Sequence, residues 1–355
     1  MRTQPLESSR VSARFTRGVG RLVLERPEAL NALDLGMVRG LREALEAWRD
    51  EPDGERILLE GAGDRGLCAG GDVRGLAESI MSGNAEGAGT FFREEYALNA
   101  AIAEYPKPIV ALADGVTMGG GIGLAGHAAV RIVTERSALA MPETRIGFTP
   151  DVGGTRLLAR APGHSGEYLA LTGGTMSAAD AIYAGFADLL VPSERLDGVR
   201  EALESRADPG GATEVAMLFD ESPEPSELAR RRPWIDSVFA APDVAAIIAG
   251  LRERPEPEAS ATADLLATLS PTAMTVTLAS VRAARTDATL RTTLEREYGL
   301  AMWFAHTQPD LPEGVRARLI DKDGAPRWRP ASLGELPDDL VEQAFAFRPD
   351  VPLWA

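Results

Sequence analysis

The sequence predicts an α/β fold that is followed by a mainly helical C-terminal region. Up to about residue 208, short apolar strand candidates alternate with glycine-rich loops and helical patterns, which is typical of an α/β fold. Beyond the turn signal Asp208–Gly211, strand candidates largely vanish and apolar residues recur at helical spacing. Hydrophobic residues make up 45% of the 355 residues and charged residues 25%, the usual mixture for a globular protein with a substantial core.

The first expected elements are a strand and a helix. Residues 13–26 carry an alternating apolar stretch that ends at Arg26-Pro27, which predicts a strand running into a turn. From Leu35 to Trp48, apolar residues recur at helical spacing, and Asp34 stands where an N-cap is expected.

Two buried-strand candidates lead into glycine-rich segments. Ile57–Leu59 opens into residues 61–71, and Ile109–Leu112 leads to Gly119-Gly120-Gly121. Glycines where a strand meets a helix let a ligand approach the backbone and leave amide N–H groups exposed. Two such amides could form an oxyanion hole, although a glycine triplet on its own more often forms a tight turn. Two further short strands are expected at Val130–Thr134 and Ala138–Ala140.

The last part of the chain predicts helices. Ser270-Pro271 is a helix start with serine as cap and proline at the first helical position. Helical spacing follows it and resumes from Leu290 to Phe304. Proline-rich stretches at 222–225 and 253–257 are expected to be linkers or loops. We therefore expect residues 1–212 to form the α/β core and residues 213–355 a helical region that packs on it.

The charge balance excludes several classes of partner. A net charge of −16 with a pI near 4.8 argues against broad electrostatic binding to nucleic acid or to anionic membranes. No apolar stretch reaches the ~18 residues that a spanning helix requires, and no secretory signal is apparent. Cys68 is the single cysteine, which favours a reducing compartment. We expect a soluble cytoplasmic protein, and the strong preference for arginine over lysine fits a bacterial genome rich in G and C.

Carboxylates accompany the glycine segments. Asp72 follows Cys68–Gly71, Glu143 follows a proline, and Asp151 stands just before Gly153-Gly154. Each has an ordinary structural explanation, because Asp72 and Asp151 could be helix N-caps and Glu143 a solvated loop carboxylate. The ordered set, rather than any single motif, points to chemistry.

The ordered set resembles the successive signatures of the crotonase (enoyl-CoA hydratase/isomerase) superfamily. The matching segments are Arg26-Pro27 with Asn31-Ala32-Leu33, Ala69-Gly70-Gly71-Asp72, Met118-Gly119-Gly120-Gly121, Met141-Pro142-Glu143-Thr144 and Pro150-Asp151-Val152-Gly153-Gly154. Other segments are similar to the 3-hydroxyisobutyryl-CoA hydrolase branch, namely Phe91–Tyr96, Glu313–Ala317 and Leu319–Asp323. The resemblance runs from about residue 13 to about residue 346.

This resemblance implies a fold and an activity. The fold would be a crotonase-like spiral of stacked ββα units, with residues 1–212 as the catalytic core and residues 213–355 as a helical C-terminal region. The activity would be hydrolysis of a short branched 3-hydroxyacyl-CoA thioester, with 3-hydroxyisobutyryl-CoA of valine breakdown as the expected substrate. Acyl-CoA is then the partner, no cofactor or metal is implied, and a homo-oligomer is left open. Because CoA is polyanionic and the chain acidic, its site would need a local basic patch or backbone N–H groups.

Carried over position by position, the resemblance also implies roles for individual residues. The amides of Gly71 and Gly120 would form the oxyanion hole. Glu143 matches the acid/base or nucleophilic carboxylate of the family, and Asp151 matches a second carboxylate of the hydrolase branch. Glu95 matches a residue reported at the substrate site, so that Glu95, Gly120, Glu143 and Asp151 would bind the substrate.

One departure from the family pattern bears on the reaction. Hydratases that use two glutamates carry the first of them where this chain has Gly123. Glycine cannot position or deprotonate water, so hydration of a double bond loses half of its machinery, and the hydrolase branch lacks that glutamate as well. Two alternatives stay open: an enoyl-CoA hydratase or isomerase that relies on Glu143 alone, and a non-catalytic acyl-CoA-binding protein.

Other reactive side chains give weaker signals. Cys68 lies beside a candidate oxyanion segment, but no histidine neighbours it, and a free cysteine is commonly a small buried hydrophobe. The spacing of His127, His164 and His306 indicates neither a metal site nor a catalytic triad. We expect no metal.

Overall fold

The structure is a computed structural model that describes residues 2–3, 8, 10–205 and 211–354. Its contacts divide the chain into two compact units. Unit 1 comprises Met1–Gly71, Ala97–Leu139 and Met176–Glu227, and unit 2 comprises Asp72–Tyr96, Ala140–Thr175 and Leu228–Ala355. The units are interleaved along the chain and do not coincide with residues 1–212 and 213–355, so the expected division into two consecutive domains stays a prediction. Residues 208–210 of the predicted turn lie outside the described residues.

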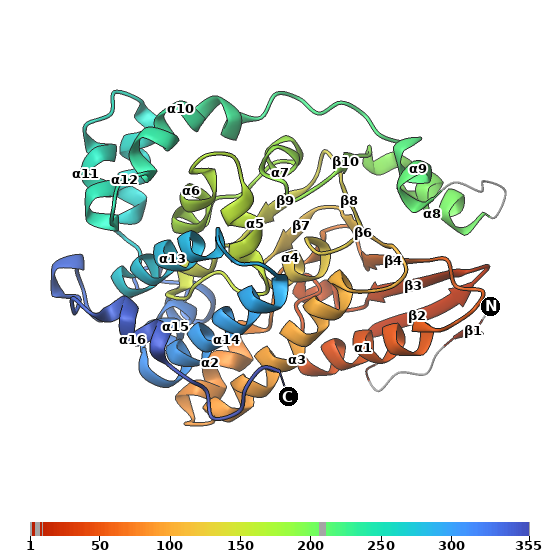
Figure 1. Ribbon diagram of the computed structural model, residues 1–355, viewed down its shortest axis with the longest axis horizontal. Helices are drawn as coiled ribbons and strands as arrows, with labels where there is room; N and C mark the ends of the chain where they lie inside the picture. The colour runs from red at the N-terminus through yellow and green to blue at the C-terminus, as the bar shows by residue number, and fades with distance from the viewer. Residues whose placement is uncertain (1, 4–7, 9, 206–210, 355) are drawn as a thin grey trace. The chain divides into compact units, whose positions relative to one another are not determined.

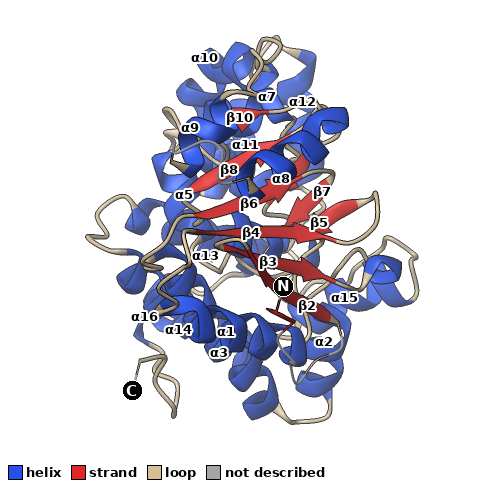
Figure 2. Ribbon diagram, turned by 90° about the vertical axis from the view of Figure 1, so that its right-hand side faces the viewer, coloured by secondary structure: helices blue, strands red, loops and turns tan. Residues whose placement is uncertain are grey.

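Unit 1 contains a seven-stranded sheet (Figure 2). Its strands, in spatial order, are β1 (Arg2–Thr3), β2 (Val11–Thr16), β3 (Val19–Leu24), β4 (Arg56–Gly61), β6 (Ile109–Ala113), β8 (Val130–Val133) and β10 (Leu189–Leu190). The pairs β1–β2 and β2–β3 are antiparallel, and every later pair is parallel. The stretch predicted as one strand over residues 13–26 is therefore a hairpin of two, because Arg17 and Gly18 adopt positive φ angles and reverse the chain.

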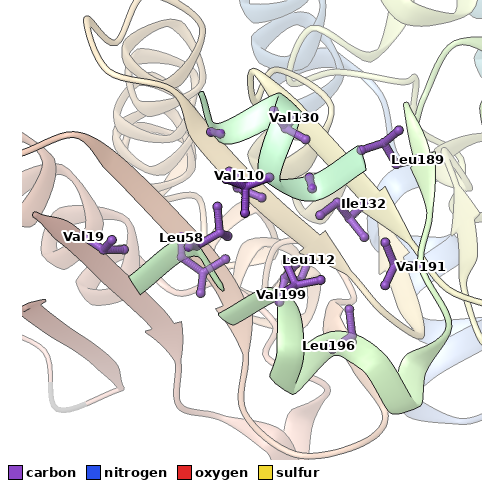
Figure 3. Packing of buried hydrophobic residues seen from close by; sticks show 14 residues of the cluster. Val19, Leu58, Val110, Leu112, Val130, Ile132, Leu189, Val191, Leu196 and Val199 are labelled. Carbon is purple, nitrogen blue, oxygen red and sulfur yellow. The ribbon is translucent and has the colours of Figure 1, made fainter. Parts of the chain in front are cut away.

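The central strands of this sheet are apolar because both of their faces are covered. All five residues of β6 are buried, as are Ile57, Leu58 and Leu59 of β4, which is typical of parallel strands. On one face, Leu58, Val110 and Ile132 belong to a buried cluster completed by Leu196 of helix α8 (Leu196–Glu204) (Figure 3). The strands predicted at 57–59, 109–112 and 130–134 are confirmed.

A second sheet of three short strands carries the glycine loops. It consists of β5 (Gly66–Cys68), β7 (Val116–Met118) and β9 (Ala138–Ala140), in that order. β5 and β7 run parallel, so their carboxyl ends meet at the same edge of the sheet. The loops that follow Cys68 and Met118 therefore begin side by side.

The helices begin where local signals predict them. Helix α1 (Leu35–Arg49) is capped by Asp34, whose side chain accepts a hydrogen bond from Met37 N at 2.9 Å. Helix α3 (Ala85–Ala103) passes from unit 2 into unit 1. The remaining helices of unit 1 are η1 (Pro27–Ala29), α4 (Gly120–Ala125), α7 (Ala178–Ala184), η3 (Ser193–Arg195) and α9 (Ala212–Met217).

Unit 2 consists almost entirely of helices, which Figure 1 colours from orange through green to blue. They are α2 (Val73–Met81), η2 (Glu143–Ile146), α5 (Gly154–Arg160), α6 (Ser165–Thr172), α10 (Glu227–Phe239), α11 (Val244–Arg252), α12 (Pro257–Leu266), α13 (Pro271–Ala284), α14 (Leu290–Thr307), α15 (Asp310–Val315), η4 (Arg316–Ile320), η5 (Leu333–Glu335) and α16 (Leu340–Ala346).

The C-terminal region is helical, as predicted. Between residues 211 and 354, all of which are described, the chain forms no strand, only an isolated bridge at Glu221. Ser270 caps α13 by accepting a hydrogen bond from Ala273 N at 3.0 Å. The loop expected at 253–257 is shorter than predicted, because Pro257 is already the first residue of α12. Within the described part of the chain, no helix is both long and apolar enough to cross a membrane.

Candidate active site

In unit 1, the structure brings the two glycine loops together. A Cβ atom on Gly70 would lie 3.2 Å from the carbonyl oxygen of Met118 and 3.5 Å from Gly120 N. Gly121 packs even more closely, because a Cβ there would lie 2.3 Å from the Cys68 carbonyl oxygen. Only glycine fits such an approach of two backbones. Gly71 and Gly120 therefore belong to two adjacent loops, as the sequence predicts.

The backbone amides of Gly71 and Gly120 are the candidate donors for a ligand. Gly120 is the first residue of α4, where helical N–H groups have no partner within the helix. The segment before Gly71 is held by a hydrogen bond of 2.8 Å from Leu33 N to the Gly70 carbonyl. Across the described residues, neither amide donates to a backbone carbonyl outside its own element. Their role as an oxyanion hole stays a prediction.

Two other residues near these loops have structural roles. Asp72 caps α2, since its carboxylate accepts a hydrogen bond from Gly75 N at 3.4 Å. The cap interpretation is therefore confirmed for Asp72. Cys68 is fully buried, and its Sγ accepts a hydrogen bond from Gly70 N at 3.4 Å. It packs as a small hydrophobe, in agreement with the interpretation from the sequence.

Unit 2 contains a cluster of buried carboxylates. Glu143, the first residue of η2, and Glu95, on α3, are both buried. Within the described part of the chain, Glu143 Oε2 and Glu95 Oε1 are buried and have no hydrogen-bond partner. Buried polar atoms are almost always paired, so an unpaired one calls for an explanation. A ligand that offers hydrogen-bond donors would satisfy both, whereas a proton on the carboxyl group would only remove its charge.

Asp151 belongs to the same cluster and is not a helix cap. Gly153 occupies the N-cap position of α5, and no side chain caps that helix from there. The carboxylate of Asp151 instead accepts a hydrogen bond of 2.7 Å from the hydroxyl of Tyr96. The alternative that Asp151 serves only as a cap is therefore wrong.

Two residues of the cluster were missed by the sequence analysis. Tyr96 lies in the segment Phe91–Tyr96, but no role was assigned to it. Glu297, on α14, is completely buried and accepts hydrogen bonds from Gly153 N at 2.6 Å and from Thr155 N at 3.0 Å. Its signal was available, because position 297 falls on the helical face that also carries Leu294 and Ala301. A carboxylate in an apolar stripe is rarely buried without a partner.

The environment favours protons on these carboxyl groups. Burial raises the pKa of Glu143 well above its usual range, and the charge of Asp151 adds to the effect. Burial and the charge of Asp151 likewise raise the pKa of Glu95 well above its ordinary value. Burial raises the pKa of Asp151 to about 7, against the hydrogen bond from Tyr96, which lowers it.

Glu297 follows the same pattern. Burial raises its pKa to about 7, while the hydrogen bond from the Thr155 hydroxyl and the two backbone N–H groups lower it. Neighbouring carboxyl groups of this kind share protons as a set. A set that holds protons near neutral pH is suited to general acid–base chemistry. No group of three His, Cys, Asp or Glu side chains among the described residues is arranged to hold a metal ion.

The family model of enoyl-CoA hydratase/isomerase matches residues 19–345 of this chain. The chain belongs to the enoyl-CoA hydratase/isomerase family. The resemblance inferred from the ordered motifs is thereby confirmed over nearly the same residues.

The names of curated relatives are more specific than the description of the family. The 3-hydroxyisobutyryl-CoA hydrolase, mitochondrial, of Danio rerio is 38% identical over 336 residues, which cover 92% of this chain and 87% of the relative. The protein of the same name from Rattus norvegicus is 40% identical over 334 residues, covering 92% and 86%. The Homo sapiens protein is 37% identical over 334 residues, with the same coverage.

Two solved structures resemble this family member over nearly its whole length. One, described as a carnitinyl-CoA dehydratase from Mycobacterium thermoresistibile, has a TM-score of 0.92 and 44% sequence identity, and the match covers 98% of both chains. The other, described as an enoyl-CoA hydratase from Rhodobacter sphaeroides, has a TM-score of 0.89 and 40% identity, covering 95% of this chain and 97% of that one. The predicted crotonase-like α/β fold with its helical C-terminal region is confirmed.

Proposed function

We propose that this enzyme hydrolyses a short branched 3-hydroxyacyl-CoA thioester, converting 3-hydroxyisobutyryl-CoA to 3-hydroxyisobutyrate and CoA. The observation that carries the proposal is the buried pair Glu143 and Asp151: Glu143 Oε2 has no partner among the described residues, and the hydroxyl of Tyr96 holds the Asp151 carboxylate. Relatives 37–40% identical over 92% of the chain bear the name of this activity.

Gly123 favours hydrolysis over hydration as the activity of this enzyme. The names of the two solved neighbours point to a hydratase or dehydratase, reactions for which a second glutamate at this position would help to hold water. Helix α4 reads Gly-Gly-Ile-Gly-Leu-Ala and carries no acidic residue at all. Thioester hydrolysis requires only a carboxylate that acts on the carbonyl carbon, a proton for the leaving thiolate and stabilisation of the oxyanion.

The amides of Gly71 and Gly120 would bind the thioester oxygen as it gains negative charge. Each such donor is typically worth ~2.7–4 kcal/mol to the transition state, so the pair would supply a large share of the rate enhancement. Backbone donors also suit an acidic protein, because they bind a developing anion without a basic side chain.

Glu143 and Asp151 would then act as a pair that shares one proton. In the route we favour, the shared proton moves from Glu143 to Asp151 once the substrate is bound. The ionised Glu143 oxygen then bonds to the thioester carbon, the C–S bond breaks, and Asp151 gives the proton to the departing thiolate. Water then cleaves the resulting anhydride, which releases the product carboxylate and restores the Glu143 carboxylate. Of the two protons that this step frees, one returns to Asp151 and the other passes to solvent. In the alternative route, Glu143 deprotonates the water that attacks the thioester. Trapping with hydroxylamine during turnover separates the two routes, since only the anhydride would leave a modified Glu143 peptide.

Glu95 would recognise the hydroxyl group of the substrate. Its Oε1 atom is buried and unpartnered among the described residues, and it lies on α3 one residue before Tyr96. A substrate hydroxyl that donates to this oxygen would satisfy it. This role restricts the substrate to hydroxylated acyl groups.

A comparison of two assays tests the proposed function. CoA released from 3-hydroxyisobutyryl-CoA is measured with a thiol reagent, and hydration of crotonyl-CoA is followed by loss of enoyl absorbance. We expect rapid release of CoA and slow or no loss of enoyl absorbance. Faster hydration than hydrolysis would favour the hydratase or isomerase alternative. Tight binding of both compounds without turnover would favour an acyl-CoA-binding protein.

This function would place the enzyme in valine breakdown, with CoA as part of the substrate and no separate cofactor. The acidic composition, the single cysteine and the arginine bias support an enzyme of the bacterial cytoplasm that binds neither nucleic acid nor membranes. Analytical ultracentrifugation would decide whether it forms a homo-oligomer.

A further inference from the structure

Glu297 makes an unusual set of contacts with the start of helix α5. One carboxylate oxygen accepts the N–H of Gly153 at 2.6 Å, and the other accepts the N–H of Thr155 at 3.0 Å as well as the Thr155 hydroxyl. Glu297 is completely buried and lies 144 residues from Gly153 in the sequence. A buried carboxylate with three donors is held in one orientation, and it holds the donors in return.

The segment it holds is the turn that carries Asp151. Gly154 N donates to the Asp151 carbonyl at 2.7 Å, which closes the turn. Val152 and Gly153 both have positive φ angles, 54° and 79°. A β-branched residue rarely adopts a positive φ, and it persists there only when the surrounding structure enforces it. Val152 is itself fully buried, so packing and the Glu297 hydrogen bonds together enforce this backbone.

We infer that Glu297 is a positioning residue, which clamps the Asp151–Thr155 turn and thereby directs the Asp151 carboxylate toward the hydroxyl of Tyr96. The inference rests on the proposed function in so far as Asp151 takes part in hydrolysis. Glu297 contacts the backbone N–H groups of Gly153 and Thr155 and the Thr155 hydroxyl, so the role assigned to it runs through Asp151. No motif of the family resemblance includes it.

Because Glu297 can carry a charge, its positioning role should also change the pH dependence of the reaction, and not only the stability of the fold. Five groups of the cluster influence one another, and they come from α3, η2, the 151–155 turn and α14: Glu95, Tyr96, Glu143, Asp151 and Glu297. After burial and the charge of Asp151, the charge of Glu297 also raises the pKa of Glu143. Removing that charge should lower the pKa of Glu143 and shift the pH dependence of the reaction to lower pH.

The direct test is Glu297→Gln with Glu167→Gln as the matched control. Glu167 is equally buried, but it pairs with Arg285 at 2.8 Å and does not belong to the cluster. Glutamine at 297 can accept from one N–H but turns an NH₂ group toward the other. We expect kcat to fall by roughly 10- to 100-fold, since a small displacement of a catalytic group can cost about 10²-fold. We also expect the pH profile of kcat/KM to shift to lower pH in Glu297→Gln and to stay in place in Glu167→Gln.

Crystal structures of both variants provide a readout that needs no activity. The distance from Tyr96 Oη to Asp151 Oδ2 is 2.7 Å and should lengthen in Glu297→Gln only. If the wild type releases no CoA, the proposed function fails, but this distance still tests the positioning role. An unchanged Tyr96–Asp151 distance together with wild-type kcat in Glu297→Gln would overturn the inference. An equal loss of kcat in both variants, without a shift of the pH profile, would overturn it as well.

A second pair of variants covers the case in which Glu297→Gln does not fold. Thr155→Val removes only the hydroxyl that donates to Glu297, whereas Thr155→Ser keeps it. We expect the valine variant to lose activity and the serine variant to recover most of it, with the pH profile displaced in the valine variant alone. Equal activity of the two variants would contradict the inference.

Discussion

The hydroxyl of Tyr96 donates a hydrogen bond of 2.7 Å to Oδ2 of Asp151. The two residues are 55 positions apart, and both are buried. Tyr96 thus holds the carboxylate of Asp151, and the hydrogen bonds of Glu297 to Gly153 and Thr155 hold the turn that follows it. The hydrogen bond from Tyr96 also moderates the electrostatics, because it lowers the pKa of Asp151 against the stronger effect of burial.

Tyr96→Phe should therefore raise the pKa of Asp151 further. The high-pH limb of the kcat/KM profile, at which the Glu143–Asp151 pair loses its last proton, should move to higher pH. The buried carboxylate loses a donor, so the free energy of unfolding should fall by about 1–3 kcal/mol. Rate profiles and urea unfolding measure the two effects. A profile identical to that of the wild type would show that this hydrogen bond does not tune Asp151.

Asp151→Asn should reduce hydrolysis by about 10²-fold or more, because asparagine cannot carry the proton for the departing thiolate. A residue that merely capped α5 would tolerate the change, since asparagine caps as well as aspartate. Asp72→Asn is the matched control, because Asp72 does cap a helix. Steady-state CoA release from the three proteins decides the matter, and similar rates for both variants would remove Asp151 from the reaction.

The cluster should also make stability depend on pH. The folded-state pKa values of Asp151 and Glu297 are both about 7, above the ordinary values of 3.8 and 4.5, so the folded state binds more protons than the unfolded state in this interval. Their contribution to stability is thus fully present below about pH 4 and is lost as the pH rises through 7. Urea unfolding should show a free energy that decreases over this window, with a smaller slope in Asp151→Asn. If the free energy of unfolding had the same pH dependence in both proteins, groups other than Asp151 would take up the protons.

Recognition of the substrate hydroxyl gives a prediction for Glu95. Isobutyryl-CoA lacks the donor that would satisfy Oε1 of Glu95, so its kcat/KM should be far below that of 3-hydroxyisobutyryl-CoA. In Glu95→Leu the preference should shrink, because the side chain no longer offers an oxygen that accepts from the hydroxyl. Competition assays with the two substrates give the ratio directly. Equal kcat/KM values in the wild type would refute this role.

The sequence predicts the parts of this molecule that local signals determine. Apolar periodicity and capping residues locate α1 behind Asp34 and α13 behind Ser270, and continuous apolar runs locate β4 and β6. These signals act over a few residues, and at these four elements the tertiary packing agrees with them.

The contacts within the cluster could not be predicted, because tertiary packing creates them. Nothing near Asp151 in the sequence indicates that it pairs with Tyr96 rather than capping α5. The carboxylate of Glu297 reaches Gly153 across 144 positions. In the sequence, only its position on an apolar helical face indicates that it is buried. The interleaving of the two units likewise depends on where the chain returns, which no local pattern records.

The most direct test of the account is CoA release from 3-hydroxyisobutyryl-CoA by the wild type and by Glu143→Gln. Glutamine preserves the shape of the buried side chain but can neither attack the thioester nor accept a proton. We predict that the wild type turns over and that the variant loses about 10²–10⁴-fold in kcat, while calorimetry shows CoA binding close to that of the wild type. A variant that retained more than about a third of the wild-type rate would contradict the central role of Glu143.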